Sequence, residues 1–271
     1  MNKIFNGFAL CAAILMEKSM EKRVSSITRR EFSENTVPKY IVVVSMQRSS
    51  SSTLSSFLGS HPCSLNGNEI WTDDEEQDKL GAYRFSDIPQ SDVRDHAHGF
   101  LKQVHQELCD EAIGDGRIAE FCEDKCAIVV KMFDVHGISS TEIGAMIEDP
   151  DFGFVVLKRD VQGQYCSTER AWKHDDWHTT PGARSKQPTI ISNEACGKVP
   201  DEFKTRRHDW FSTARKALVA RGKPFVELSF TAVASCALRN VLVSTLGFFG
   251  LSAPFSAELE DDIGRVLEEC D

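Results

Sequence analysis

Three short apolar runs rich in β-branched residues, and a fourth candidate, are spread along the chain, each long enough for a strand and too short for a helix. They are Tyr40–Ser45, Ala127–Met132, Phe154–Lys158 and Phe225–Leu228. Because the first three runs lack polar alternation, we expect them to form strands that are buried on both faces, as in a parallel sheet. Segments of helical periodicity separate the runs, so the pattern predicts an α/β fold, a parallel β-sheet flanked by helices.

The segments between the strands place their apolar residues on one side of a helix. One such side carries Val93, Phe100, Leu101, Val104 and Leu108, and a second carries Phe203, Trp210, Ala214 and Leu218. In open parallel sheets the ligand sits beyond the carboxyl ends of the strands. Functional residues are therefore expected directly after each run.

The 271 residues carry a formal net charge of −10, and 41% of them are hydrophobic. A chain of this length and composition can bury one sizeable core, and residues 39–271 are expected to form a single domain. The acidic balance argues against a nucleic acid partner, because the phosphate backbone is bound by cationic surfaces. Any anion must instead be held by a local site.

The first 23 residues have the outline of a signal or anchor segment, with Lys3 ahead of an apolar stretch that ends at Met16. A segment packed on the core is the alternative. The polar residues 24–38 suit a linker, and any membrane association is expected to run through this amino-terminal part alone. Nine cysteines permit disulfides in an oxidising compartment. Localisation is left open, with a Golgi or secretory lumen favoured over the cytoplasm.

A loop of small hydroxyl residues follows the first predicted strand and leads into a predicted helix. It consists of Arg48, Ser49, Ser50, Ser51, Ser52 and Thr53. Free backbone N–H groups at a helix start, together with hydroxyl groups, form a cradle for an anion such as phosphate. The loop has neither glycine nor the lysine of the G-x-x-x-x-G-K-[ST] motif, which argues against a nucleoside triphosphatase or kinase of that class.

This loop and the His61-Pro62 pair after it resemble the sulfotransferases that use 3'-phosphoadenosine 5'-phosphosulfate (PAPS). The loop of that family usually reads Arg-Ser-Gly-Ser/Thr-Ser/Thr-Leu. Ser50 stands where the family generally has glycine, which predicts either a slightly different loop or impaired turnover.

A second block, far along the chain, strengthens the resemblance. Arg159 comes directly after the third predicted strand, and Ser167 follows it by eight residues. The family binds the 3'-phosphate of its donor with an arginine and a serine at this spacing. A guanidinium can hold phosphate oxygens through two hydrogen bonds, and a hydroxyl adds a neutral donor.

The resemblance covers the chain from about Tyr40 to Leu251 and implies a P-loop-like sulfotransferase fold with PAPS as co-substrate. Arg48 and the loop from Ser49 to Thr53 would then hold the 5'-phosphosulfate. An arginine at position 48, where the cytosolic branch commonly has lysine, favours the Golgi carbohydrate or tyrosylprotein branch.

The resemblance also implies residues that act in catalysis. Glu69 would be the general base, since it resembles the glutamate base of the tyrosylprotein and related enzymes, with His61 and His136 as weaker candidates. Lys131, in the second predicted strand, either adds a cation to the site or faces solvent at a strand edge. Trp172 lies beyond Ser167, where core packing is the safer expectation.

The acceptor is left open among a carbohydrate, a tyrosine peptide and a small molecule. No metal is required by the expected reaction, since no metal-binding aspartate pair or Walker-type hydroxyl is present. Two alternatives stay open. One is a P-loop-type kinase or other nucleotide-binding protein, and the second is a catalytically inactive sulfotransferase-like binding protein.

Overall fold

The computed structural model describes residues 37–68, 71, 94–174, 196–233 and 238–251. Within these ranges five strands form one parallel sheet in the order β2-β3-β1-β4-β5. The strands are β1 (Tyr40–Ser45), β2 (Ser64–Asn68), β3 (Ala127–Phe133), β4 (Phe152–Lys158) and β5 (Phe225–Ser229). The α/β fold predicted from the sequence is confirmed.

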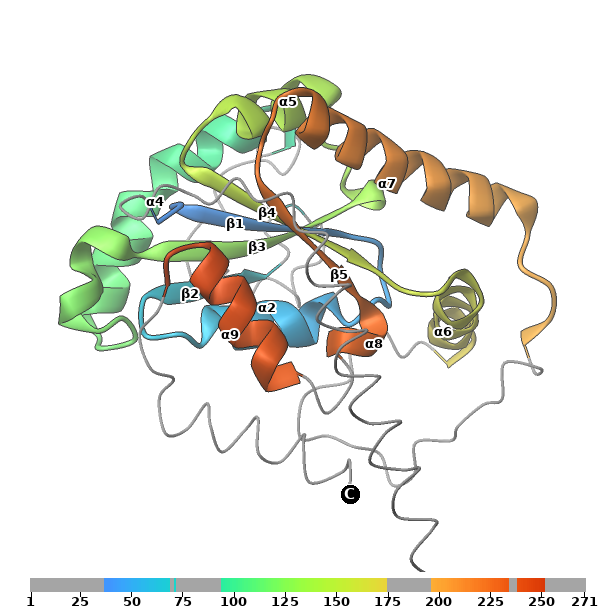
Figure 1. The fold of residues 1–271 in the computed structure, drawn as a ribbon, viewed down its shortest axis with the longest axis horizontal. Coiled ribbons are helices and arrows are strands. Elements are labelled where there is room, and N and C mark those ends of the chain that lie inside the picture. The colour runs from blue at the N-terminus through green and yellow to red at the C-terminus, as the bar shows by residue number, and fades with distance from the viewer. Residues whose placement is uncertain (1–36, 69–70, 72–93, 175–195, 234–237, 252–271) are drawn as a thin grey trace, which may run out of the picture.

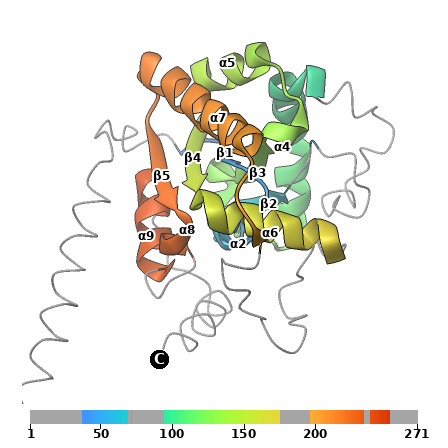
Figure 2. The same cartoon turned by 90° about the vertical axis from the view of Figure 1, so that its right-hand side faces the viewer.

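Helices cover both faces of this sheet (Figure 1; Figure 2). Above it in Figure 1 lie α4 (Ala97–Gly114), α5 (Ser140–Glu148) and α7 (Asp201–Ala220). Below it lie α2 (Ser51–Gly59), α8 (Phe230–Val233) and α9 (Leu238–Phe248). The remaining elements are α6 (Val161–His174), which follows β4 at one end of the sheet, and two short 3-10 helices, η2 (Glu120–Lys125) and η3 (Asp134–His136).

The central strands are buried along their whole length, as their uninterrupted apolar sequences predict. Every residue of β1 and β3 is buried, and in β4 only Lys158 is partly exposed. The register pairs Ser45 of β1 with Phe133 of β3, and Val44 with Val156 of β4. The carboxyl ends of these three strands therefore lie side by side, and the loops that follow them meet at the carboxyl end of the sheet.

Strand β2 was not predicted, because its sequence, Ser-Leu-Asn-Gly-Asn, has no β-branched residue. It lies at the edge of the sheet, where pairing with β3 holds it. Gly67 allows this close approach, since a Cβ atom there would lie 2.7 Å from Cγ1 of Val130. Tertiary contact therefore decides the conformation of this segment.

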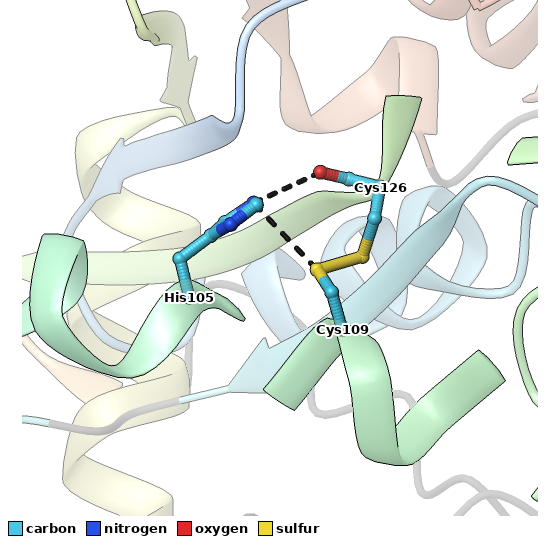
Figure 3. Close-up of side chains that lie close together, drawn as sticks. All are labelled: His105, Cys109 and Cys126. Carbon is cyan, nitrogen blue, oxygen red and sulfur yellow. Dashed lines mark hydrogen bonds between the residues drawn. A yellow bond between two sulfur atoms is a disulfide. The ribbon is translucent and has the colours of Figure 1, made fainter. Parts of the chain in front are cut away.

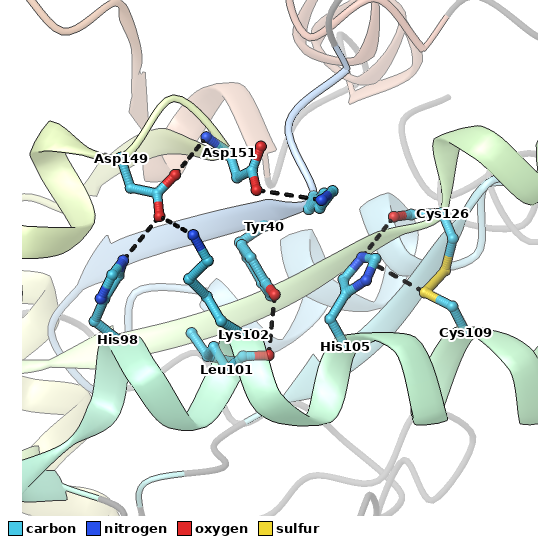
Figure 4. Close-up of polar contacts among 10 residues, drawn as sticks. Tyr40, His98, Leu101, Lys102, His105, Cys109, Cys126, Asp149 and Asp151 are labelled. Carbon is cyan, nitrogen blue, oxygen red and sulfur yellow. Dashed lines mark hydrogen bonds and ion pairs between the residues drawn. A yellow bond between two sulfur atoms is a disulfide. The ribbon is translucent and has the colours of Figure 1, made fainter.

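A polar cluster lies at the opposite, amino-terminal end of β1 and β4 (Figure 4). The Asp149 carboxylate accepts hydrogen bonds from His98 Nε2 at 2.9 Å and Lys102 Nζ at 2.7 Å. The Tyr40 hydroxyl donates to the carbonyl oxygen of Leu101 at 3.0 Å. Burial alone would raise the pKa of Asp149, but hydrogen bonds from Lys102, the Asp151 backbone and His98 lower it to about 2. These contacts fasten α4 to the sheet.

We expect Asp149→Asn to lower the free energy of unfolding by about 1 kcal/mol at neutral pH, because the charged hydrogen-bond acceptor is lost. The Asp149 carboxyl group has a lower pKa in the folded protein than in the unfolded chain, where it is near 3.8. Its contribution to stability is therefore present above pH 3.8 and is lost as the pH falls toward 2. Urea unfolding should therefore separate the wild type from the variant at pH 7 and much less near pH 2. Asp110→Asn, on the exposed side of α4, is the control, and an equal difference at both pH values would contradict the assignment.

Three disulfides link segments within the described ranges. They join Cys63 to Cys122, Cys109 to Cys126, and Cys166 to Cys196. The sequence permitted disulfides but could not predict their pairing. The third links α6 to the segment ahead of α7.

The amino-terminal expectations concern residues 1–36, which lie outside the described residues together with Val93 and Glu69. Among the helices that the structure describes, none combines the length and the apolar character needed to span a bilayer.

Candidate functional site

The loop between β1 and α2 has an unusual backbone. Arg48 (φ 64°) and Ser50 (φ 62°) are the only non-glycine residues with positive φ in the described part of the chain. Gln47, Ser49 and Ser51 are not among them, so the handedness alternates from residue to residue. Backbone of alternating handedness turns successive N–H groups toward one side and forms a concave nest for an anion.

Helix α2 begins at the end of this nest. Its first-turn N–H groups, those of Ser51, Ser52 and Thr53, have no acceptor within the helix, since the first intrahelical bond runs from Leu54 N to Ser50 O at 3.0 Å. No acidic residue lies in this first turn, and the Ser50 side chain does not cap it. The positive end of the helix dipole therefore faces the nest, an arrangement that suits phosphate or sulfate.

Ser50 keeps the left-handed conformation in which glycine is favoured, with φ 62° and ψ 25°. Ser50 therefore adopts the left-handed conformation and does not avoid it. This differs from the expectation that a serine at this position would change the loop. A left-handed backbone costs a residue with a Cβ about 1 kcal/mol. Strain of this kind is often found in ligand-binding loops.

We expect Ser50→Gly to raise the free energy of unfolding by about 0.5–1 kcal/mol, because glycine relieves the strain. Thermal or urea unfolding measures the change. Ser140→Gly in the first turn of α5 is the control, and there glycine should destabilise, by up to about 1 kcal/mol. A destabilised Ser50→Gly variant would show that the serine side chain matters more to the loop than its backbone strain.

The second predicted block lies against this loop. Arg48 Nε donates to Ser167 Oγ at 3.1 Å, and Arg159 Nη1 donates to the carbonyl oxygen of Arg48 at 2.8 Å. Ser167 accepts in this contact, so its own O–H is left to donate. The structure thus brings together two segments that are more than 100 residues apart in sequence.

The Arg159 guanidinium is held by a ring contact and lies near other cations. Its guanidinium lies 4.0 Å from the centre of the Phe230 ring, and its Nε is buried with no hydrogen-bond partner. Burial lowers the pKa of Arg159, Asp160 raises it, and the nearby charges of Arg48 and Arg170 lower it further. Cations that repel one another in a chain of net charge −10 indicate a site for an anion.

Lys131 of β3 adds a further cation close to the loop between β1 and α2. Its side chain is only 1% exposed, and Nζ donates to Ser52 Oγ at 2.9 Å. Of the two expectations for this residue, the solvent-facing one is wrong, because β3 lies inside the sheet between β1 and β2. Lys131 therefore reaches the first turn of α2 through its hydrogen bond to Ser52.

Two further residues brace the site and were missed in the sequence. Gln164, fully buried in α6, donates from Nε2 to the carbonyl oxygen of Gln47 at 2.9 Å. Its Oε1 accepts from Arg207 Nε of α7 at 3.0 Å, and Arg207 Nη2 also donates to the carbonyl oxygen of Arg159. This brace fixes the backbone ahead of the nest and the backbone of Arg159 at the same time.

We expect Gln164→Glu to lower the free energy of unfolding by about 1–3 kcal/mol, because the carboxylate cannot donate to the partly buried carbonyl oxygen of Gln47 and places a negative charge beside it. Anion binding in the nest should weaken in parallel. Gln103→Glu, an exposed position on α4, should change stability by less than about 0.5 kcal/mol. Equal effects of the two substitutions in urea unfolding would rule out the brace.

The other residues singled out in the sequence differ in burial and in hydrogen bonding. His61 is buried and its Nδ1 accepts from Cys63 N at 3.1 Å, which suits a residue that fixes the turn after α2. His136 is also buried, with Nδ1 accepting from Phe133 N at 3.2 Å. Trp172 is 70% exposed, so the expectation of core packing is wrong. The buried side of α6 carries Gln164 and Ala171, and Trp172 is turned away from it.

One group of potential metal ligands occurs in the described ranges, formed by His105, Cys109 and Cys126 (Figure 3). His105 Nε2 lies 3.0 Å from the carbonyl oxygen of Cys126 and 3.6 Å from Cys109 Sγ. The two sulfurs are bonded to each other, so neither is available as a thiolate ligand. His105 and Cys109 belong to α4, and their contacts with Cys126 tie that helix to the start of β3.

Comparison with known proteins gives a likeness of overall topology only. No family model matches the chain, and no curated protein matches it. Among solved structures, the sulfotransferase domain from the curacin biosynthetic pathway is 12% identical, with a TM-score of 0.42 over 84% of this chain and 78% of that chain. A sulfotransferase from Alicyclobacillus acidocaldarius is 14% identical, with a TM-score of 0.40 over 86% and 92%. The sulfotransferase domain from the Synechococcus PCC 7002 olefin synthase is 11% identical, with a TM-score of 0.39 over 88% and 82%. At these values no residue role is carried over from them.

Proposed function

We propose that the chain is a sulfotransferase that transfers the sulfonate group of PAPS to an acceptor hydroxyl. The observation that carries the proposal is the contact between the two predicted blocks, Arg159 to the Arg48 carbonyl and Arg48 to Ser167. A donor with phosphate groups at both its 3' and 5' positions needs two anion sites on one surface. The nest after β1 and the Arg159 and Ser167 pair after β4 are such sites.

In this proposal the 5'-phosphosulfate lies in the nest, where the N–H groups of residues 51–53 and the Arg48 guanidinium donate to it. The 3'-phosphate is bound by Arg159 and Ser167. The buried Nε of Arg159 gains a hydrogen-bond partner when the anion is present. The ribose, which carries both groups, would lie between the two sites.

Transfer would proceed in line. The bond between sulfur and the bridging oxygen of the donor breaks as a bond from sulfur to the acceptor oxygen forms, and the acceptor proton passes to a base. Negative charge then builds on the bridging oxygen, where Lys131 and the nest can stabilise it. By analogy with phosphoryl transfer, positioning and electrostatics supply most of the acceleration.

Glu69 is the proposed base, one residue beyond the last residue of β2. The carboxyl end of β2 lies next to β3, which carries Lys131. His61 and His136 are less suited, because the Nδ1 atom of each ring already accepts a backbone N–H.

The alternatives differ in their chemistry. A kinase of the P-loop class places a lysine in the loop itself and uses magnesium. Here the lysine, Lys131, comes from the neighbouring strand β3, and the proposed transfer needs no metal. A catalytically inactive binding protein would keep the donor site but would not transfer sulfonate. Ser50, which stands where the family generally has glycine, keeps this protein as the second candidate.

Residues 39–271 are proposed to act as one domain, with a carbohydrate, a tyrosine peptide or a small molecule as acceptor. Three disulfides support an oxidising compartment such as the secretory lumen. Of the two branches with arginine in the loop, neither is favoured by the described residues.

Calorimetry with the product adenosine 3',5'-bisphosphate, in the presence of a chelator, tests the donor site. We expect it to bind more tightly than ATP, because Arg159 and Ser167 read the 3'-phosphate. Transfer of radiolabelled sulfonate from PAPS to a panel of acceptors then separates the enzyme from the inactive binding protein. A preference for ATP, or a strict requirement for metal, would rule out the proposal.

A further inference from the structure

The helix that carries Ser167 also carries an arginine that the proposed function leaves unused. Arg170 comes three residues after Ser167 in α6, so the two side chains share one side of the helix. That side faces the loop between β1 and α2, because Arg48 Nε donates to Ser167 Oγ at 3.1 Å. Side chains of a helix lean toward its amino-terminal end, which directs Arg170 back toward Ser167 and Arg159.

Arg170 is partly buried, and part of its guanidinium group is unsatisfied. Its Nε atom is buried without a hydrogen-bond partner, as is the Nε atom of Arg159. In the part of the chain that the structure describes, no aspartate or glutamate forms an ion pair with Arg170. A buried N–H group without an acceptor costs free energy, so two such groups on nearby arginines indicate a site for a ligand that accepts hydrogen bonds.

Three guanidinium groups influence one another here, those of Arg48, Arg159 and Arg170. Burial has the largest effect on the pKa of Arg159 and lowers it, Asp160 raises it, and the charges of Arg48 and Arg170 lower it further. Asp160 Oδ1 accepts from Gly163 N at 2.6 Å, and among the described residues Asp160 forms no ion pair with any of the three arginines. Three positive charges and one negative charge leave this cluster with a net charge of +2.

The charge and the free N–H groups of the cluster match a phosphate monoester. Such a group carries about −1.5 to −2 charges at pH 7 and has three oxygen atoms that accept hydrogen bonds. A guanidinium can bind two of these oxygen atoms at once. A free hydroxyl group, in contrast, carries no charge and would leave the arginines to repel one another.

We propose that Arg170 is a further donor-binding residue, which contacts the 3'-phosphate of the nucleotide together with Arg159 and Ser167. The inference rests on the proposed function and names a residue that determines its donor specificity. Arg170 selects nucleotides that carry the 3'-phosphate over those with a free 3'-hydroxyl group. It has no contact with the 5'-phosphosulfate in the nest.

Calorimetry with adenosine 3',5'-bisphosphate and adenosine 5'-monophosphate tests the role of Arg170. We expect Arg170→Gln to weaken binding of the bisphosphate about tenfold and to leave affinity for the monophosphate within about twofold, because only the bisphosphate carries the 3'-phosphate. Arg170→Lys keeps the charge without the planar fork and should lose less affinity than Arg170→Gln. Lys173→Gln removes an exposed charge three residues further along α6 and should bind both nucleotides like the wild type.

Two results would overturn the inference and leave the proposed function in place. One is a preference for the bisphosphate in Arg170→Gln that equals the preference of the wild type. The other is an equal loss of affinity for both nucleotides, which would show that Arg170 acts through the fold of α6. Failure of the proposed function has a different signature, because the wild type itself would then show no preference for the bisphosphate, and the inference would fall with it.

Discussion

Replacement of Arg159 by alanine is expected to weaken the binding of adenosine 3',5'-bisphosphate at least about tenfold, a loss of about 1.4 kcal/mol or more. The reason is the loss of a guanidinium that the Phe230 ring and the Arg48 carbonyl hold in place. Isothermal calorimetry gives the affinity, and circular dichroism shows whether the fold is kept. Lys173→Ala, an exposed position on α6, is the matched control.

Comparison of two ligands separates the 3'-phosphate contact from a general disturbance of the loop. Adenosine 5'-monophosphate lacks the 3'-phosphate, so its affinity should change little in Arg159→Ala. The wild type should prefer the bisphosphate over the monophosphate, and the variant should lose most of that preference. Equal losses for both ligands would mean that Arg159 acts through the Arg48 carbonyl alone, and unchanged affinity for the bisphosphate would remove the assignment.

Replacement of Lys131 by methionine is expected to lower the rate of sulfonate transfer about 100-fold or more, since one preorganised donor at a developing charge is worth about 3 kcal/mol. Donor affinity should change less, because the charge that Lys131 meets is larger in the transition state than in the bound donor. Release of radiolabelled sulfate from PAPS measures the rate even before an acceptor is known. Ser52→Ala removes the hydrogen-bond partner of Lys131 and should have a smaller effect.

The stability of the Lys131 variant adds an independent check. Lys131 is buried, and methionine has a similar volume without a charge to desolvate. The melting temperature should therefore hold or rise while transfer is lost. A variant with full transfer would show that Lys131 supports α2 and takes no part in the reaction.

Local sequence was sufficient to predict the central strands. The runs around Val42, Val129 and Val155 are apolar without alternation, and the structure buries them in β1, β3 and β4. The hydroxyl loop was recognisable because its chemistry lies in consecutive residues. Arg159 and Ser167 were proposed from the resemblance to the sulfotransferase family, and the parallel register of β1 and β4 explains why the segment after β4 lies near the loop.

Features that depend on distant contacts could not be predicted. Strand β2 has a polar sequence and is held by β3, while the brace of Gln164 and Arg207 joins α6, α7 and the loop. A glutamine in a helix gives no sign that both ends of its amide are engaged. The left-handed backbone of Arg48 and Ser50 was likewise hidden, because neither residue type favours that conformation.

A crystal structure of the protein with adenosine 3',5'-bisphosphate tests the central claim most directly. We predict the 3'-phosphate within hydrogen-bonding distance of Arg159 and Ser167, and the 5'-phosphate at the backbone N–H groups of residues 51–53. A nucleotide bound elsewhere, or one whose two phosphates both avoid the nest and Arg159, would contradict the account.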